Sequence, residues 1–292
     1  MRSVLAIVRR NLRLFFRDRM NVFFSLLGAL ILFLLYTLFL GNMQRSDIEH
    51  EFSGASSDHV FAFVDSWMFA GIVLIATVTT GLGALSALIE DGESGRFRDF
   101  LVSPTRQRSL VLGYLLSAIV VALIMSTVVI AVSVVYLGLV SGLWLDAPTI
   151  ARIGALTLLC CAAFTALCAF IVSFVRSSSA NSALNTVVGT ATGFIAAAYI
   201  PLGALPQSVA NVISAMPFAE AGMLLRREFT ASTLTELTGG NAQAGAQVRD
   251  AYGIDLAVGS QAISPGFVVL VLLVMTVVFT LLAAMRIRSR IQ

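Results

Sequence analysis

Long apolar runs alternate with short polar segments along most of this 292-residue chain. Six of these runs approach or exceed the roughly 20 residues that cross a bilayer as a helix. We expect spans at about 21–40, 66–89, 109–140, 152–175, 182–200 and 264–286. The third run has no charged residue over 109–145, which is too long for one upright span. It therefore predicts a long tilted helix with an outer turn at Ser141 and Gly142.

The segment before the first span, residues 1–20, carries six arginines. Drawn as a helix, it places five of them within an arc of about 100° and apolar side chains on the opposite side. The arginines are Arg2, Arg9, Arg10, Arg13 and Arg17, and the apolar residues are Val4, Leu5, Ile7, Val8, Leu12, Phe15 and Phe16. This pattern predicts a helix in the membrane interface, with its arginines toward lipid phosphates.

The composition agrees with a membrane protein. Hydrophobic residues make up 58% of the chain, charged residues 12%, and the mean hydropathy is +0.92, whereas a soluble domain carries roughly 25% charged residues. We expect an all-α polytopic protein with a single transmembrane domain over 1–292. All 19 basic residues are arginine, and because a P-loop requires a lysine, we expect any ATPase to be a separate chain.

The arginines also predict the topology. Fourteen lie in the N-terminal segment, the 90–108 and 176–182 loops and the C-terminal tail, against five in the remaining loops. Because arginine excess marks the cytoplasmic side, both termini are predicted to be cytoplasmic. The acidic loop 41–65 and the segment 226–262 are then extracellular. Residues 239–241 and 242–246 are expected to form flexible loop.

The most charged internal segment is 90–108, which holds eight of the chain's 35 Asp, Glu and Arg residues. Phe97, Phe100 and Leu101 recur at i, i+3 and i+4, which predicts a short helix with one apolar stripe. Pro104 ends this helix, because the residue before a proline is disfavoured in helical angles. Periodicity alone leaves two interpretations open: a docking surface for a soluble partner, or an interfacial loop with its aromatic rings in lipid.

Three of the six prolines, Pro201, Pro206 and Pro217, interrupt the region 201–225. We expect a re-entrant turn or surface-lying helices there, since broken backbone at membrane depth must be covered by protein or water. Glu220 is the one acid in this region. Either it is hydrated at the outer rim or it binds a cation or a polar group of a substrate.

The second and fifth spans carry a few polar residues, which either pack helices together or line a path through the membrane. They are Thr77, Thr80, Asn181, Asn185 and Thr192. Cys160, Cys161 and Cys168 lie within one span and are expected to act as small hydrophobic residues. We expect no metal site and no catalytic group, since no nucleophile, base or ligand set converges in the sequence.

Together these motifs resemble the permease subunits of type-2 ABC transporters. In that family an acidic element, here Asp91, Glu93 and Gly95, is followed by an amphipathic helix and a Ser-Pro pair, here Ser103 and Pro104. A connecting helix precedes the first span, and a proline-rich re-entrant turn ends in Leu-Arg, here Leu225 and Arg226. The resemblance implies a coupling helix at 90–106 that docks on an ATPase. Its candidate residues are Glu90, Asp91, Glu93, Gly95, Arg96, Phe97, Phe100, Leu101 and Pro104.

The resemblance further implies an exporter subunit in a bacterial cytoplasmic membrane, paired two-fold with a second copy or a sister permease. Two cytoplasmic ATPase subunits would bind ATP and Mg, and this chain would bind lipid but no cofactor and no nucleic acid. A path lined by the five polar residues suits hydrophobic or amphipathic cargo: a drug, a lipid-linked molecule or a peptide. A gradient-driven transporter or channel is the alternative, as is a membrane-embedded enzyme. A gradient-driven transporter usually carries acidic residues deep in its spans, and an enzyme needs convergent catalytic groups.

Overall fold

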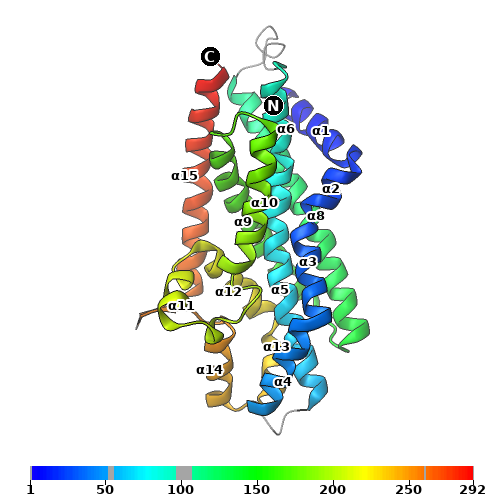
Figure 1. Cartoon of the computed structure of the whole chain (residues 1–292), viewed down its shortest axis with the longest axis vertical. Coiled ribbons are helices and arrows are strands. Elements are labelled where there is room, and N and C mark those ends of the chain that lie inside the picture. Colours follow the sequence, from blue (N-terminus) through cyan, green and yellow to red (C-terminus); the bar gives the residue numbers. More distant parts are fainter. Residues whose placement is uncertain (1, 52–55, 97–106, 260, 292) are drawn as a thin grey trace.

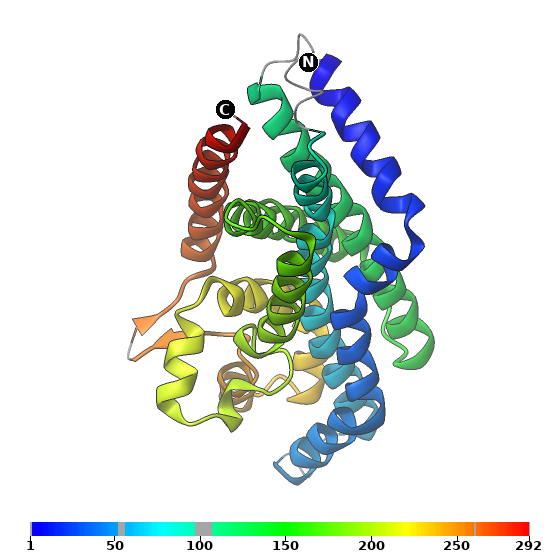
Figure 2. The same ribbon diagram turned by 45° about the horizontal axis from the view of Figure 1, so that its top comes forward.

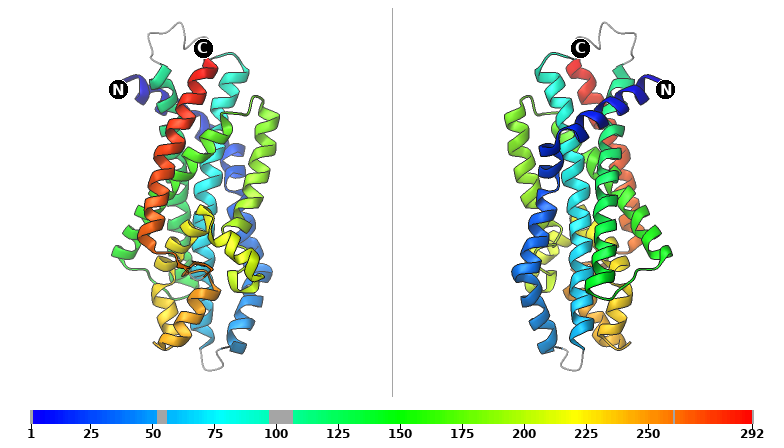
Figure 3. Two further views of the ribbon diagram at one scale, coloured as in Figure 1. Left: turned by 90° about the vertical axis from the view of Figure 1, so that its left-hand side faces the viewer. Right: turned by 90° about the vertical axis from the view of Figure 1, so that its right-hand side faces the viewer.

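The computed structural model describes residues 2–51, 56–96, 107–259 and 261–291. Within these residues nearly all secondary structure is helical, arranged as an elongated bundle (Figure 1). Both chain termini and the end of α6 (Ser86–Glu93) lie at one end of this bundle, together with α1 (Arg2–Arg17). We call this the arginine-rich end. The opposite, far end holds α4 (Gly41–Glu51) and α14 (Ala242–Ala251) (Figure 3).

The amphipathic helix α1 runs obliquely along one side of the bundle and leads into α2 (Arg19–Ser25) (Figure 2). Asp18 caps α2 by accepting hydrogen bonds from the backbone N–H groups of Met20 and Asn21. Part of the apolar side of α1 packs on protein, since Ile7 and Phe15 are both buried, whereas Leu5 is 70% exposed. This packing fixes the approach of α1 to the bundle.

The first span consists of α3 (Leu27–Leu35), a π-helical turn η1 (Tyr36–Leu40) and α4, so the helix continues eleven residues beyond its expected end. The prediction of a loop over 41–65 is therefore wrong for Gly41–Glu51 and from Ser57 onward, which are helical. Side-chain contacts explain the difference. Gln44 donates to the Tyr36 hydroxyl at 2.6 Å, and Arg45 pairs with Asp65 at 2.8 Å.

The helix α5 (Ser57–Ala84) is the centre of the molecule, and every residue from 62 to 83 is buried. Gly71, Gly81 and Gly83 let neighbouring helices approach closely: a Cβ at Gly81 would lie 2.5 Å from the Thr165 hydroxyl. After a break at Leu85 the chain continues as α6. Together α5 and α6 span 37 residues, or about 56 Å of helix, so their ends project beyond an apolar layer about 30 Å thick.

The long third apolar run forms one helix, α8 (Gln107–Val140). Its 34 residues extend about 51 Å, which requires a tilt or a projecting end. The turn expected at Ser141 and Gly142 is also present, with Gly142 at a φ of +67°, a conformation that glycine adopts without strain. The fourth span, α9 (Ala147–Val172), begins after Asp146 with a proline in its first turn.

The chain then forms α10 (Ser178–Ile195), a short 3-10 turn η2 (Leu202–Ala204), α11 (Gln207–Ser214) and α12 (Pro217–Phe229). The axes of α11 and α12 differ by 85°, so this pair forms a sharply bent element in the half of the bundle nearer the far end. Pro206 precedes α11, and Pro217 occupies the first turn of α12, where a missing N–H costs nothing. The proline-based prediction of a broken element over 201–225 thus matches the geometry.

The described part of the segment 226–262 is mostly folded, and the expectation of flexible loop is wrong for residues 242–246, which are helical, whereas 239–241 form a turn and its exit. It contains α13 (Ala231–Leu237), α14 and a hairpin of β1 (Ala257–Val258) and β2 (Gln261–Ala262), in which Ala257 pairs with Ala262. Asn241 caps α14 through the N–H groups of Gln243 and Ala244. The indole of Trp67 donates to the carbonyl of Tyr252 at 2.7 Å, which fastens the segment to α5. The final helix is α15 (Pro265–Ile291).

Five helices in the described part of the chain are long and apolar enough to cross a membrane, and the bent α11–α12 pair would make a sixth. They are Leu27–His50, Ser57–Glu93, Gln107–Val140, Ala147–Val172 and Pro265–Arg288. The expected fifth span, now α10, is not among them, although its 18 residues stand in the bundle beside α5. The all-α polytopic architecture is confirmed.

Candidate functional site

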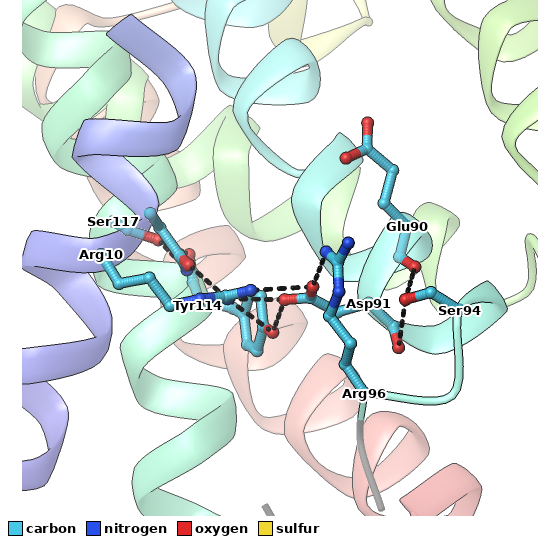
Figure 4. A network of polar contacts seen from close by, with 8 residues as sticks. Arg10, Glu90, Asp91, Ser94, Arg96, Tyr114 and Ser117 are labelled. Carbon is cyan, nitrogen blue, oxygen red and sulfur yellow. Dashed lines mark hydrogen bonds and ion pairs between the residues drawn. The ribbon is translucent and has the colours of Figure 1, made fainter. Parts of the chain in front are cut away.

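A network of polar side chains connects three helices at the arginine-rich end (Figure 4). Its centre is Asp91 of α6, which is 1% exposed. Arg10 of α1 donates to both carboxylate oxygens of Asp91, at 2.6 and 2.9 Å. Arg96 donates at 2.9 Å, and the Tyr114 hydroxyl of α8 donates through a short hydrogen bond. The network continues from Asn11 to Ser117 at 3.0 Å.

The geometry explains how a carboxylate can be buried here. Removing a charge from water is costly unless it is paired and hydrogen-bonded. Asp91 receives four hydrogen bonds, including a bidentate pair from one guanidinium, the strongest arrangement for these groups. The hydrogen bond from Arg10 to Asp91 in turn raises the pKa of Arg10 above its usual value. Asp91 thus fixes α1 and α8 to the end of α6.

Two acidic residues that the sequence assigned to a partner ATPase are bound within the chain. Asp91 is enclosed by Arg10, Arg96 and Tyr114, so in this structure its carboxylate is not available to a partner. Glu93 accepts hydrogen bonds from the backbone N–H and the hydroxyl of Ser178, the first residue of α10. Each acid thus finds a donor on a neighbouring helix, and a role of these two residues in coupling stays a prediction.

The other coupling residues lie around this network. The carboxylate of Glu90 points away from the Asp91 cluster and is exposed (Figure 4). Gly95 has a φ of +76°, and the side chain of Arg96 is 53% exposed beside Asp91. Phe97, Phe100, Leu101 and Pro104 lie outside the described residues, so the predicted apolar stripe stays a prediction.

Sequence reasoning missed Arg10, which it placed toward lipid phosphates with the other arginines of α1. Arg10 is half-buried, whereas Arg9, Arg13 and Arg17 are exposed. A signal was present in the helical arrangement, since Arg10 lies at the edge of the arginine arc nearest Ile7 and Asn11. A buried asparagine on the apolar side of α1 indicates a polar contact with another helix.

Four of the five predicted path residues are buried within the subunit, and Asn185 is half-buried. The hydroxyls of Thr77, Thr80 and Thr192 each donate to a backbone carbonyl of their own helix, at 2.7, 2.6 and 2.6 Å. The amide of Asn181 donates to Ser86 at 2.8 Å, and that of Asn185 donates to the Asn181 carbonyl at 2.9 Å. In this conformation these groups bind protein atoms, and a path along them stays a prediction.

The polar residues that α10 exposes are different ones. Ser182, Thr186 and Thr190 follow each other at intervals of four residues on one exposed face, with Val187 64% exposed and Phe194 54% exposed. Each hydroxyl donates to the carbonyl four residues earlier, at 3.0 to 3.1 Å. We call this the α10 polar face. Figure 3 shows α10 at an edge of the bundle, which leaves this face open.

In the bent region, Glu220 of α12 is 5% exposed, and its Oε2 has no hydrogen-bond partner among the described residues. Arg226, at the other end of α12, is fully buried and donates to the carbonyls of Ala196 and Ala197 at 2.6 and 2.7 Å. It also lies 5.0 Å from the ring of Trp67. Arg226 therefore fastens α12 to the C-terminal end of α10, where a cation is favoured by the helix dipole.

Fold and sequence place the chain among polytopic α-helical membrane proteins. The family described as ABC-2 type transporter matches residues 2–227, which cover α1 through most of α12 and the whole Asp91 network. The chain belongs to this family, and it is a membrane-embedded component of an ABC transporter. Comparison with curated proteins finds no match.

Proposed function

We propose that this chain is the permease subunit of an ATP-driven exporter whose ATPase is a separate, cytoplasmic chain. Family membership supports the permease role. The absence of lysine supports a separate ATPase, because a P-loop lysine contacts the β/γ-phosphates. ATP and Mg would then bind to the partner subunit. The arginine excess around the chain termini supports a cytoplasmic orientation of that end in a bacterial membrane.

The observation that carries the proposal is the anchoring of the segment that would receive the ATPase. Residues 97–106 connect α6 to α8 at the arginine-rich end, and both flanking helices bind the Asp91 network. A contact that transmits force needs such fixed ends, since a freely hinged loop would absorb the movement. Phe97, Phe100 and Leu101 would supply the apolar anchors, and the exposed Glu90 would orient the partner.

The α10 polar face supports pairing with a second permease. Hydroxyl-bearing residues in a membrane usually face protein or water instead of lipid, yet Ser182, Thr186 and Thr190 are exposed. A second copy, or a sister permease, would cover this face around a two-fold axis. A path beside uncharged hydroxyls and apolar groups suits hydrophobic or amphipathic cargo, such as a drug, a lipid-linked molecule or a peptide.

The coupling role is tested by truncating the three apolar side chains together, Phe97→Ala/Phe100→Ala/Leu101→Ala. Anchor residues of an interface typically contribute about 2 kcal/mol or more, so the dissociation constant of the ATPase should rise at least about thirtyfold. A P-loop ATPase that co-purifies with the unchanged permease serves as the partner, and the readouts are its co-purification with each variant and its binding to permease in nanodiscs. Leu273→Ala/Val274→Ala/Val277→Ala is the matched control, since these α15 side chains are about half exposed.

Unchanged ATPase binding in the triple alanine variant would mean that the segment 97–106 is only a membrane-surface turn. That result would overturn the coupling proposal. Cargo is tested separately, by stimulation of ATPase activity in the reconstituted complex. A hydrophobic dye, a lipid-linked sugar, a peptide and sodium are compared. Stimulation by sodium alone would contradict the proposed cargo class while leaving the permease role intact.

A further inference from the structure

The end of α6 has a second attachment, on the face away from the Asp91 network. Glu93 accepts hydrogen bonds from the N–H of Ser178, at 3.0 Å, and from the Ser178 hydroxyl. Seven residues earlier, Ser86 accepts from the side-chain amide of Asn181 at 2.8 Å. Both contacts join α6 to the first turn of α10, although the paired residues lie 85 and 95 positions apart in the chain.

The helix start explains why an acid is suited to this place. The first N–H groups of a helix have no partner within the helix and carry partial positive charge. Ser177, the N-cap of α10, accepts from the N–H of Ala180 at 3.3 Å. The N–H of Ser178 needs a different acceptor, and this acceptor is the carboxylate of Glu93 on α6. Glu93 therefore completes the cap of α10.

Glu93 differs from Asp91 in ways that matter for movement. Asp91 is 1% exposed and bound by three side chains, which makes it a fixed anchor between α6, α1 and α8. Glu93 is exposed, four residues before the segment 97–106 begins, and its partner is the start of the helix that bears the α10 polar face. A displacement of the end of α6 thus reaches α10 through Glu93 and Ser86.

We propose that Glu93 is a positioning residue that transmits movement of the ATPase-docking segment to α10, through its cap on Ser178. This inference rests on the proposed coupling function. Beyond that function, α10 moves with α6 because of this contact. Removal of Glu93 should therefore leave ATPase binding in place but reduce the nucleotide-driven movement of α10. The family match to residues 2–227 does not assign this role to Glu93.

The test measures α10 directly and needs no transported substrate. Val187→Cys, on the α10 polar face, carries an environment-sensitive fluorophore; the native Cys160, Cys161 and Cys168 are buried. The labelled permease is assembled with its ATPase in nanodiscs, and emission is compared before and after addition of Mg-ATP with vanadate. With Glu93 intact, we expect a nucleotide-dependent emission shift.

Glu93→Ala should reduce the nucleotide-dependent shift at least threefold while the ATPase still co-purifies and hydrolyses ATP. Glu93→Gln, which keeps an acceptor but loses the charge, should give an intermediate shift. Glu236→Ala is the control, because Glu236 is also an exposed acid at a helix end but its carboxylate accepts no hydrogen bond among the described residues; it should keep the full shift.

A cross-link distinguishes transmission from a general loss of structure. In Glu93→Cys/Ser178→Cys, oxidation should restore the shift by replacing the hydrogen bonds with a covalent tie, and reduction should abolish it again. A full shift in Glu93→Ala, or no recovery on oxidation, would overturn the inference while leaving the coupling function standing. Failure of the parent permease to bind the ATPase would overturn both.

Discussion

Replacing Asp91 with alanine should release α1 from the bundle. The change removes both hydrogen bonds from Arg10 and the one from Tyr114. Breaking a buried ion pair by removing one partner costs about 3–5 kcal/mol. The Arg10 side chain is 31% exposed and can be rehydrated in part, which favours the lower value, about 3 kcal/mol. Arg96 adds little, because its side chain is 53% exposed and water screens the pair.

The labelling rate of a cysteine at position 7 measures this release. Ile7 is 5% exposed in the contact between α1 and α8, so an Ile7→Cys thiol reacts only when α1 separates from the bundle. A loss of about 3 kcal/mol increases the separated population about a hundredfold. We therefore expect maleimide labelling of Ile7→Cys in nanodiscs to accelerate by that factor in Asp91→Ala.

Two variants show whether the effect belongs to the ion pair. Arg13→Ala is the control, because Arg13 lies on the same helix, is exposed and has no ion pair among the described residues; labelling should stay within about twofold. Arg10→Ala/Asp91→Ala should label no faster than Asp91→Ala alone, since partners in one contact are not additive. Unchanged labelling in Asp91→Ala, or fully additive effects in the double variant, would refute the reasoning.

Three further outcomes are expected. Arg226→Ala should lower the unfolding free energy by about 3 kcal/mol, because it leaves buried carbonyls without their donor. Thermal unfolding in detergent measures this loss, and Arg226→Lys should recover only part of the lost stability. Gly113→Ala should displace α1, since the added Cβ would lie 2.8 Å from Ile7 Cβ, an atom that Ile7→Cys keeps, and labelling of Ile7→Cys would again report it. For topology, the exposed sites Glu49→Cys and Gln243→Cys should react with a membrane-impermeant maleimide from outside intact cells; reaction only after cell rupture would invert the orientation.

The sequence predicts those features that depend on local chemistry. The uncharged stretch after residue 108 becomes the 34-residue α8, and Gly142 forms the turn after it. Pro217 begins the second arm of the 85° bend, as its fixed φ and missing N–H favour. In each case the deciding information lies within a few residues, so the pattern in the sequence was sufficient.

The features that the sequence did not predict depend on contacts between distant residues. Composition indicated a flexible loop around residue 242, but Val248 is buried and Tyr252 receives the indole N–H of Trp67, 185 positions away. The same holds for Asp91. Its spacing from Glu93 and Gly95 marks a functional element, yet only the approach of α1 shows that Arg10, 81 positions away, binds it. Such pairs are not visible in the periodicity of either segment.

The two-residue spacing of Asp91 and Glu93 determines which helices each carboxylate contacts. Two residues along a helix are about 200° apart, so the two carboxylates point to nearly opposite sides of α6. One side binds α1 and α8, and the other caps α10. A two-residue interval therefore lets one short helix hold three others, whereas an interval of three or four would place both acids on one face. If Glu93 transmits movement as proposed, a displacement of α6 is shared between the fixed α1–α8 side and the more exposed contact with α10.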